Sequence, residues 1–298
     1  MEINQIRPLK SDFTEVLKRL VLNVEILYYY GKLPEIRQKT VAIVGSRRNT
    51  QYGYDVAYRA AYEAAKAGAV VVSGLAYGID SVAHRAALDA GGVTIAVLGT
   101  PITEIYPRCH KALAEEIVAK GGAVISEYGP KDVAGGGKEM RARFLKRNRI
   151  IAGLSDAVLI AEAADHSGTL NTAVHALDIG VDLLAVPGDI NKTTSVGCNR
   201  LLKQGAIPYT EPDDLLDLLF PERIAKRRSK KLLNKLILKT ETEVEKQVLT
   251  LVFEGIQDGD EIVQRLRLSA TDFSQAITIL EIKGLVMSLG MNKWMMRG

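Results

Sequence analysis

The sequence predicts an α/β protein, a doubly wound parallel-sheet Rossmann-like domain with a short helical N-terminal preface and a small C-terminal winged-helix domain. From Val41 onward, short apolar runs rich in β-branched residues alternate with stretches of helical period. These runs are apolar throughout, as expected for strands buried on both faces of a parallel sheet. After residue 243 the pattern changes to three helices and a hairpin, the order of a winged helix-turn-helix.

The N-terminal segment, residues 1–40, is expected to be helical, because FTEVLKRLVLNVEILYYY has a helical pattern and turn signals follow at Gly31 and Pro34. The remaining boundaries place the Rossmann-like domain at 41–221, a basic linker at 222–243 and the winged-helix domain at 244–298. We expect the preface to pack against the Rossmann-like domain.

The Rossmann-like domain is predicted from alternating strands and helices. The expected strands are 41–45, 69–74, 93–99, 123–127, 157–163 and 182–188. The expected helices are Gly53–Ala67, Asp80–Ala90, His110–Lys120 and Gly168–Ile179, and glycine follows several of their ends. Ligands of such sheets bind beyond the carboxyl ends of the strands, so functional residues should lie in the loops there.

The C-terminal domain is predicted from helices at 244–253, 260–266 and 270–283, with Ser269 as the N-cap of the third. A hairpin with a turn at Met291 and Asn292 would form the wing. The third helix has no cation before Lys283, and from residue 244 onward six basic residues face seven acidic ones. Because a duplex reader needs Lys and Arg against phosphates, this pattern favours a protein contact over duplex DNA.

The charge of the chain is unevenly distributed. The net charge is +4, yet residues 222–239 contain eight Lys or Arg and one Glu, a net +7, so the rest sums to −3. No apolar run approaches the roughly 20 residues of a membrane span, and the N-terminus lacks a signal-peptide pattern. We therefore expect a cytoplasmic protein without a membrane partner. Cys109 and Cys198 match no metal-ligand spacing, and no metal or cofactor is expected.

The loop after the first strand reads Gly45, Ser46, Arg47, Arg48. Here a dinucleotide-binding domain carries GxGxxG, but Arg47 and Thr50 stand in place of the second and third glycines. An arginine at this edge obstructs a buried cofactor and suits a phosphodiester that passes over the edge. The alternative is an ordinary surface arginine pair.

Residues 138–149 contain six cations and one Glu, with Phe144 among them. Cations interleaved with an aromatic ring hold single strands through phosphate pairing and base stacking, although a solvated helix face is the alternative. Ser167, Gly168 and Thr169 open a helix whose N-terminus favours anions. The predicted DNA-binding residues are Ser46, Arg47, Arg48, Ser73, Gly74, Arg143, Phe144, Lys146, Arg147, Asn148, Arg149, Ser167, Gly168 and Thr169.

Evidence for an enzyme is weak. The four histidines show no metal-binding spacing, and His84, between alanines in a helix, is expected to be packed in the core. Glu162 and Asp165 are the only candidates for acid/base chemistry, and no catalytic residue is predicted. The alternative to DNA binding is a nucleotide-binding or nucleotide-hydrolysing Rossmann enzyme related to LOG-type phosphoribohydrolases. Residues 162–172 lack the paired glycines and the glutamate of the PGGxGTxxE signature of those enzymes.

Several motifs together resemble the DprA/Smf family of bacterial DNA-processing proteins. They are VAIVGSR (41–47), SGLAYGID (73–80), IAVLGT (95–100) with YP (106–107), ISE (125–127), RNRIIAGLSDAVLIAEA (147–163), SGTLNTA (167–173), AVPGDI (185–190) and GCNRLLKQGA (197–206). The resemblance implies single-stranded DNA binding, dimerisation through the Rossmann-like domain and loading of RecA recombinase during natural transformation; it implies no enzymatic activity.

The resemblance implies that the DNA-binding positions of the family correspond in this chain to Arg47, and to Phe144 with Lys146, Arg147 and Arg149. Where the family usually has Phe-Pro, this chain has Phe144-Leu145, which leaves the path of the expected loop open. We expect a bound DNA strand to place its phosphates on Arg47, Arg147 and the amides of Ser167–Thr169, and to stack a base against Phe144. About 4 to 5 neutralised phosphates would give a log–log salt slope of roughly −3 to −3.5.

Overall fold

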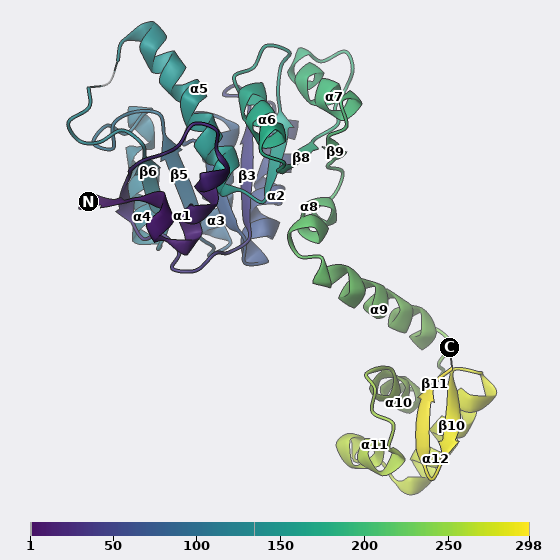
Figure 1. Ribbon diagram of the computed structural model, residues 1–298. Coiled ribbons are helices and arrows are strands. Elements are labelled where there is room, and N and C mark those ends of the chain that lie inside the picture. Colours follow the sequence, from purple (N-terminus) through teal and green to yellow (C-terminus); the bar gives the residue numbers. More distant parts are fainter. Residues whose placement is uncertain (1, 134, 298) are drawn as a thin grey trace. The chain divides into compact units, whose positions relative to one another are not determined.

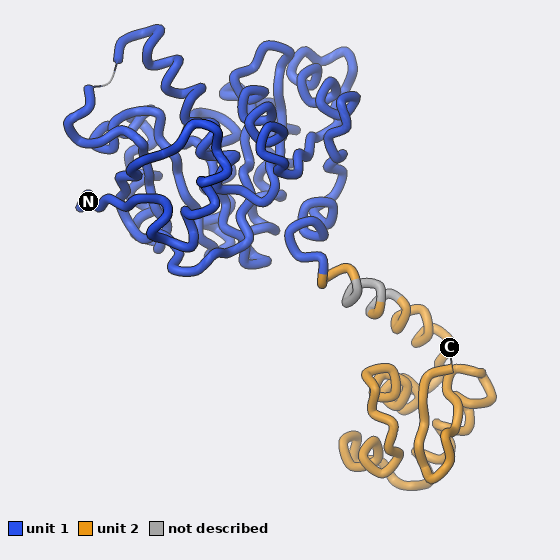
Figure 2. The backbone as a smooth tube through the Cα atoms, in the orientation of Figure 1, with its two compact units in different colours: residues 1–221 blue, residues 222–298 orange. Residues whose placement is uncertain are grey.

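The computed structural model describes residues 2–133 and 135–297. The chain divides into two compact units, residues 1–221 and residues 222–298 (Figure 2). Each unit has its own hydrophobic core, so we describe them separately. Within the described residues, no helix combines the length and apolar character that crossing a membrane requires.

The first unit is built on one sheet, in which the described residues form nine strands in the order β1-β2-β6-β5-β4-β3-β7-β8-β9 (Figure 1). The strands are β1 (Asn4–Ile6), β2 (Leu27–Gly31), β3 (Thr40–Gly45), β4 (Val70–Ser73), β5 (Thr94–Leu98), β6 (Ala123–Ser126), β7 (Ala157–Glu162), β8 (Asp182–Ala185) and β9 (Ile207–Pro208). Strands β3 to β9 are parallel. The strand order reverses between β3 and β7, which makes the end of this pair the topological switch point.

Helices cover both faces of the sheet, as the continuous apolar strands predict. One face carries α2 (Gln51–Lys66), α3 (Ile79–Asp89) and α8 (Pro212–Leu219) over its centre, with α4 (Lys111–Ala119) over β5 and β6. The opposite face carries α1 (Asp12–Glu15), α5 (Gly137–Leu154), α6 (Thr169–Asp178) and α7 (Val196–Lys203) (Figure 1). Short 3-10 helices lie at Pro8–Lys10, Val16–Arg19, Arg108–His110 and Thr193–Ser195. The predicted fold class is confirmed.

The N-terminal preface corrects one expectation. Its helical part is short and ends at Arg19, whereas Leu27–Gly31, expected to continue the helix, is strand β2. Strand β2 pairs antiparallel with β6 and receives β1 on its other side. Tyr28, Tyr29 and Tyr30 therefore belong to the sheet, because covering the edge of β6 outweighs the helical pattern of the sequence.

Helix α5 corrects a second expectation. The cations of residues 138–149 were expected in a loop before a short helical turn, but they lie within one helix of 18 residues. The run KEMRARFLKRNR consists mainly of good helix formers. Leu145 keeps the backbone N–H that a proline would lack, so the helix continues through this position.

The second unit begins with α9 (Glu222–Ile237), which occupies most of the segment expected as a basic linker. Helices α10 (Glu243–Phe253), α11 (Gly259–Leu266) and α12 (Ala270–Ile282) and the hairpin β10 (Val286–Gly290) and β11 (Lys293–Met296) follow. The Ser269 side chain caps α12 by accepting a hydrogen bond from Asp272 N, and the turn lies at Met291 and Asn292. The predicted winged helix is present.

Candidate nucleic-acid interface

The switch point between β3 and β7 holds a cavity of about 880 Å³ at the carboxyl edge of the sheet. Its walls come from the loop after β3, the loop after β7 and the α5 helix, and we call it the switch-point cavity. Its lining includes most of the predicted contacts, namely Ser46, Arg47, Arg48, Phe144, Arg147, Asn148, Ser167, Gly168 and Thr169. The structure thus brings residues from three distant segments to one cavity, and their contact with DNA stays a prediction.

The loop after β3 is held by backbone geometry. Pairing of β3 with β7 shifts register at Gly45, and Ser46 N donates to Glu162 O at 2.8 Å. The Ser46 hydroxyl accepts from Arg48 N at 3.1 Å, which tightens the turn. Arg47 and Arg48 are exposed at the rim. Fixed backbone beneath two exposed guanidinium groups suits a site for phosphate.

The loop after β7 leads into α6 and forms the opposite wall. The Thr169 hydroxyl donates to Gly45 O at 2.9 Å and so ties the two loops together. Ser167 N donates to Ala164 O, and Thr169 N donates to Ser167 Oγ. Of the three amides predicted to bind phosphate, these two are occupied within the described loop, and Gly168 N has no acceptor there. It remains available at the positive end of α6.

Helix α5 contributes one face to the cavity. Its lining positions are Gly137, Met140, Arg141, Phe144, Leu145, Arg147, Asn148 and Ile151. Most of these recur at intervals of three and four residues, which is one face of a continuous helix. Met140 and Arg141 were missed because the run was interpreted as a loop; a helical reading would have found them.

Phe144 is the aromatic centre of the site. Its ring packs on Gly99, where a Cβ would come within 2.5 Å of the ring. The Arg47 guanidinium carbon lies 5.5 Å from the ring centroid, a cation–π contact. The ring of Tyr106 lies 5.4 Å away, centroid to centroid. Phe144 is half-buried, so part of its ring is available to a ligand.

Arg147 lines the switch-point cavity but is almost wholly buried, which argues against the predicted contact with DNA. It is only 4% exposed and donates to the carbonyls of Gly74 and Val97. Burial lowers the pKa of Arg147 to about 10, while Asp80 opposes this shift, so the side chain stays charged at neutral pH. Gly74 is required here because a Cβ would come within 2.5 Å of the Arg147 guanidinium. Arg147 is therefore a positioning residue.

Other predicted contacts are also buried, Arg149 and Ser73 among them. Arg149 pairs with Glu127 at 2.7 Å, and its side chain is 4% exposed. Ser73 is fully buried and donates its hydroxyl to Ile43 O at 2.7 Å. The sequence indicated the right segments, but it could not show which side of each backbone faces solvent. In this structure both side chains bond to groups within the protein.

Arg143 and Lys146 lie on the side of α5 that faces β6. Their charged groups contact the ring of Tyr128, at 4.5 Å and 5.6 Å from its centroid. Lys146 also pairs with Glu127 at 3.1 Å, and Arg143 pairs with Glu139 at 2.7 Å. Neither residue lines the cavity, so a strand would reach them only beyond it.

Asn148 and Asp80 complete the interior of the site. The Asn148 amide donates to Gly168 O at 3.3 Å, while its oxygen accepts from Arg147 Nε at 3.2 Å. Asp80, which sequence analysis did not select, is buried and accepts from Gly74 N at 3.0 Å. Burial raises the pKa of the Asp80 carboxyl, and Arg147 opposes that effect. These groups couple α5, α6 and the loop after β4.

The two acid/base candidates have other partners. The Glu162 carboxylate is buried and accepts from Thr50 N and Thr50 Oγ1, which fixes the start of α2. Asp165 forms an ion pair with Arg200. His84, expected in the core, is fully buried. Within the described residues, no group of three or more His, Cys, Asp or Glu could hold a metal ion.

The fold and cavity define a Rossmann-like α/β protein with a cationic, aromatic-lined site at its switch point and a C-terminal winged helix. Two family models match the chain, DNA recombination-mediator protein A over residues 4–220 and the DprA winged helix domain over residues 237–290. The chain belongs to the DprA/Smf family of DNA recombination-mediator proteins.

The sequence of the chain is also similar to those of several proteins of this family. The chain is 44% identical to Protein Smf of Escherichia coli K12 over 193 residues, which are 65% of this chain and 50% of that protein. It is 40% identical to the DNA processing protein DprA of Streptococcus pneumoniae over 205 residues, 69% of each chain. The putative DprA of Mycobacterium tuberculosis is 38% identical over 86% of this chain and 64% of that protein. The chain thus spans about half to two thirds of these proteins.

Two solved structures share the fold. DprA of Streptococcus pneumoniae superposes with a TM-score of 0.65 at 37% identity, covering 72% of this chain and 74% of that one. DNA processing protein A of Helicobacter pylori superposes with a TM-score of 0.63 at 30% identity, covering 74% and 97%. The Helicobacter protein's structure is described for its single-stranded DNA binding mode.

Proposed function

We propose that this chain is a cytoplasmic, single-stranded DNA-binding recombination mediator that protects incoming strands and helps load RecA during natural transformation. It would act as a homodimer through the Rossmann-like domain. Family membership and the single-stranded DNA binding described for the Helicobacter relative support the proposal. No residue is assigned a catalytic role.

The observation that carries the proposal is Arg47 placed over the Phe144 ring at the rim of an open cavity. A cation next to a half-buried aromatic ring suits a phosphate and its base together. Arg48, Arg141 and the Gly168 amide lie around the same cavity and would hold neighbouring phosphates. Such contacts read no base edges, so we expect little sequence preference.

Burial of Arg147 and Arg149 changes the expected salt dependence. The exposed cations at the cavity are Arg47, Arg48 and Arg141, which would neutralise about 3 phosphates. For single strands this gives a log–log slope of about −2, shallower than the slope derived from sequence.

The test is an anisotropy titration of a labelled oligothymidylate at several salt concentrations, with unlabelled duplex as competitor. We expect Arg47→Ala to weaken binding about tenfold or more and to reduce the slope by about 0.7. Arg85→Ala, which removes an exposed arginine on α3 outside the cavity lining, is the control and should bind like the parent. Parent-like binding by Arg47→Ala would contradict the proposal.

The mediator role needs its own readout. Filament assembly by RecA on single strands covered with single-strand binding protein should be faster in the presence of this chain. Arg47→Ala should lose the stimulation in proportion to its lost affinity, while Arg85→Ala keeps it. Normal DNA binding without any effect on RecA would leave DNA binding in place and remove the mediator role.

A further inference from the structure

Two exposed tyrosines continue the aromatic surface away from the cavity. Tyr106 follows β5 and is 39% exposed, with its ring 5.4 Å from that of Phe144. Tyr77 lies between β4 and α3 and is 48% exposed. Both loops stand at the carboxyl edge of the sheet, where the cavity opens. We call Tyr106 and Tyr77 the aromatic shelf, which continues from the Phe144 ring in the cavity.

The loops that carry the shelf are joined to each other. His110 Nδ1 lies 2.8 Å from Leu75 O, which links the 3-10 helix after Tyr106 to the loop after β4. The Tyr77 ring packs edge-on against His110 at 5.3 Å between centroids. The pKa of Tyr77 is raised, first by its hydrogen bond with Cys109 and to a smaller extent by Tyr106. The contacts of His110 thus hold the loops of Tyr77 and Tyr106 next to each other.

The charges near the shelf suit a polyanion. Arg108, two residues after Tyr106, is exposed and forms no ion pair with the described residues. Glu104 is the acidic residue of the same loop, while Glu127 is neutralised by Lys146 and Arg149. Rings interleaved with a free cation are how single strands are bound without sequence preference.

We propose that the aromatic shelf is a second base-stacking subsite that carries a single strand from the switch-point cavity across the ends of β4 and β5. The occupant is the same strand whose phosphates the cavity holds, so the inference rests on the proposed function. It adds a direction to the site: the strand leaves Phe144 towards Tyr106 and then Tyr77. Short oligonucleotides fill the cavity alone, and longer ones reach the shelf.

The cysteines allow a test on the unaltered full chain. Cys109, which lies beside Tyr77, is exposed, whereas Cys198 is 1% exposed and burial raises its pKa to about 11. Iodoacetamide should therefore label Cys109 alone. A saturating oligothymidylate of about 16 nucleotides should slow this labelling about tenfold, because a strand on the shelf covers the thiol. An unchanged rate would overturn the inference.

Variants test the stacking itself. Tyr106→Leu and Tyr77→Leu should each bind the oligothymidylate of about 16 nucleotides roughly tenfold more weakly, and one of about 4 nucleotides like the parent. Tyr106→Phe keeps the ring and should keep the affinity. Tyr62→Leu, at a half-buried tyrosine towards the far end of α2, is the control.

The two hypotheses fail separately. If both leucine variants bind the long strand as tightly as the parent while Arg47→Ala loses affinity at every length, the shelf is excluded and the proposed function stands. If Arg47→Ala binds like the parent, the proposed function fails. Cross-linking of an oligonucleotide containing 5-iodouracil to Tyr106 or Tyr77 would show stacking directly, and a destabilised variant could not produce that result.

Discussion

At the scale of single residues, Arg147 stabilises the interface from beneath. Its guanidinium is bonded to the carbonyls of Gly74 and Val97 and lies beside buried Asp80. Removing a buried cation leaves these acceptors unsatisfied. The residue therefore fixes the loop after β4 relative to α5, and exposed Arg47 is left as the nearest guanidinium for phosphate.

We expect Arg147→Leu to lower the free energy of unfolding by about 3 kcal/mol. Arg47→Ala, at an exposed position, should change it by less than about 0.5 kcal/mol. Urea denaturation of both variants, monitored by circular dichroism, measures the difference. Equal stability of Arg147→Leu and the parent would show that the buried contacts contribute nothing.

His84 makes stability depend on pH. The Thr94 hydroxyl donates to Val71 O, so His84 Nδ1 must donate to that hydroxyl, and Nε2 is left buried without a partner. Burial lowers the pKa of His84 from 6.5 to about 3. Between these values the unfolded chain binds a proton that the folded chain does not, so stability falls as pH falls.

The contribution of His84 should be fully present above pH 6.5 and be lost towards pH 3, with a slope of up to about 1.4 kcal/mol per pH unit. His84→Asn can keep a donor to Thr94 and cannot titrate, so it should show a shallower slope. Urea midpoints of both proteins between about pH 7 and pH 4.5 measure this. Identical slopes would mean that His84 does not control acid stability.

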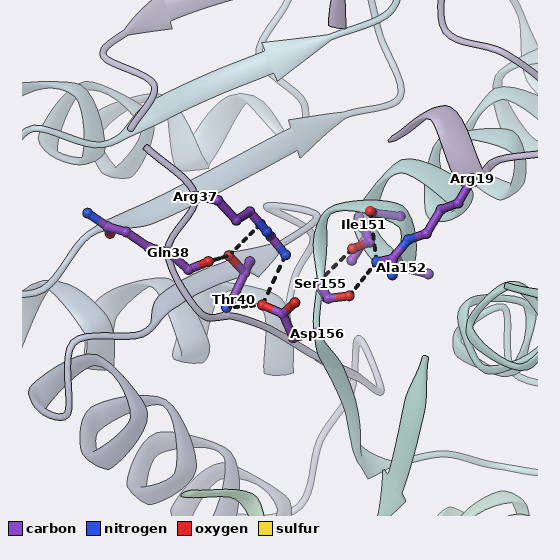
Figure 3. Close-up of polar contacts among 9 residues, drawn as sticks. Arg19, Arg37, Gln38, Thr40, Ile151, Ala152, Ser155 and Asp156 are labelled. Carbon is purple, nitrogen blue, oxygen red and sulfur yellow. Dashed lines mark hydrogen bonds and ion pairs between the residues drawn. The ribbon is translucent and has the colours of Figure 1, made fainter. Parts of the chain in front are cut away.

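At the scale of elements, α5 is anchored at its C-terminal end. Its middle turns carry Phe144 and Asn148 to the cavity, and its C-terminus is held by the N-terminal segment (Figure 3). Arg19 donates to Ala152 O at 3.4 Å, to Gly153 O at 3.0 Å and to Ser155 O. These are the carbonyls that a helix end leaves without partners. A cation there also complements the helix dipole.

The same segment is bonded to the sheet beside this helix end. Arg37 pairs with Asp156 at 3.0 Å, and Asp156 accepts from Thr40 N at 2.8 Å (Figure 3). The N-terminal preface thus contacts both α5 and the start of β3. The contacts of Arg19 and Arg37 lie at the edge of the sheet opposite the cavity, and those of Arg19 reach the site through α5.

Arg19→Ala should lower the free energy of unfolding by about 2 kcal/mol, because several charge-assisted hydrogen bonds to a helix end are lost. Lys18→Ala is the matched control, since Lys18 is 64% exposed and, among the described residues, pairs with Glu15 alone. It should cost less than about 0.5 kcal/mol. Denaturation curves of the two variants decide the matter, and equal effects would contradict a capping role for Arg19.

Local signals explain which elements could be predicted. Strands β3 to β8 and helices α2, α3, α4 and α6 carry their own apolar pattern and end signals, so the sequence predicts them without knowledge of neighbours. Strand β2 forms because β6 needs a partner, which no local pattern shows. Which side of α5 carries Arg147 and Arg149 follows from the helical spacing of the residues. A loop has no such spacing, so the prediction of a loop gave no orientation for these side chains.

At the scale of the whole molecule, charge and site are separated along the chain. Residues 1–221 contain 25 basic and 25 acidic residues, so the unit with the switch-point cavity has no net charge. The second unit carries the whole net charge of +4, which is the sum of +7 at residues 222–239 and −3 at residues 240–298. Under the proposed function, DNA binding by the first unit would depend on the local arrangement of Arg47, Arg48 and Arg141, because the unit has no net charge to attract a polyanion.

A fragment of residues 1–221 tests this separation. It should fold, since it contains a complete sheet with both faces covered, and it should bind single strands with the slope of about −2 expected for the cavity. If the basic segment also contacts DNA, the full chain will show a steeper slope, by about 0.7 for each added phosphate. Anisotropy titrations of both proteins at several salt concentrations separate the two contributions. If the folded fragment did not bind DNA, the cavity would be insufficient by itself, and the DNA site would have to include the second unit.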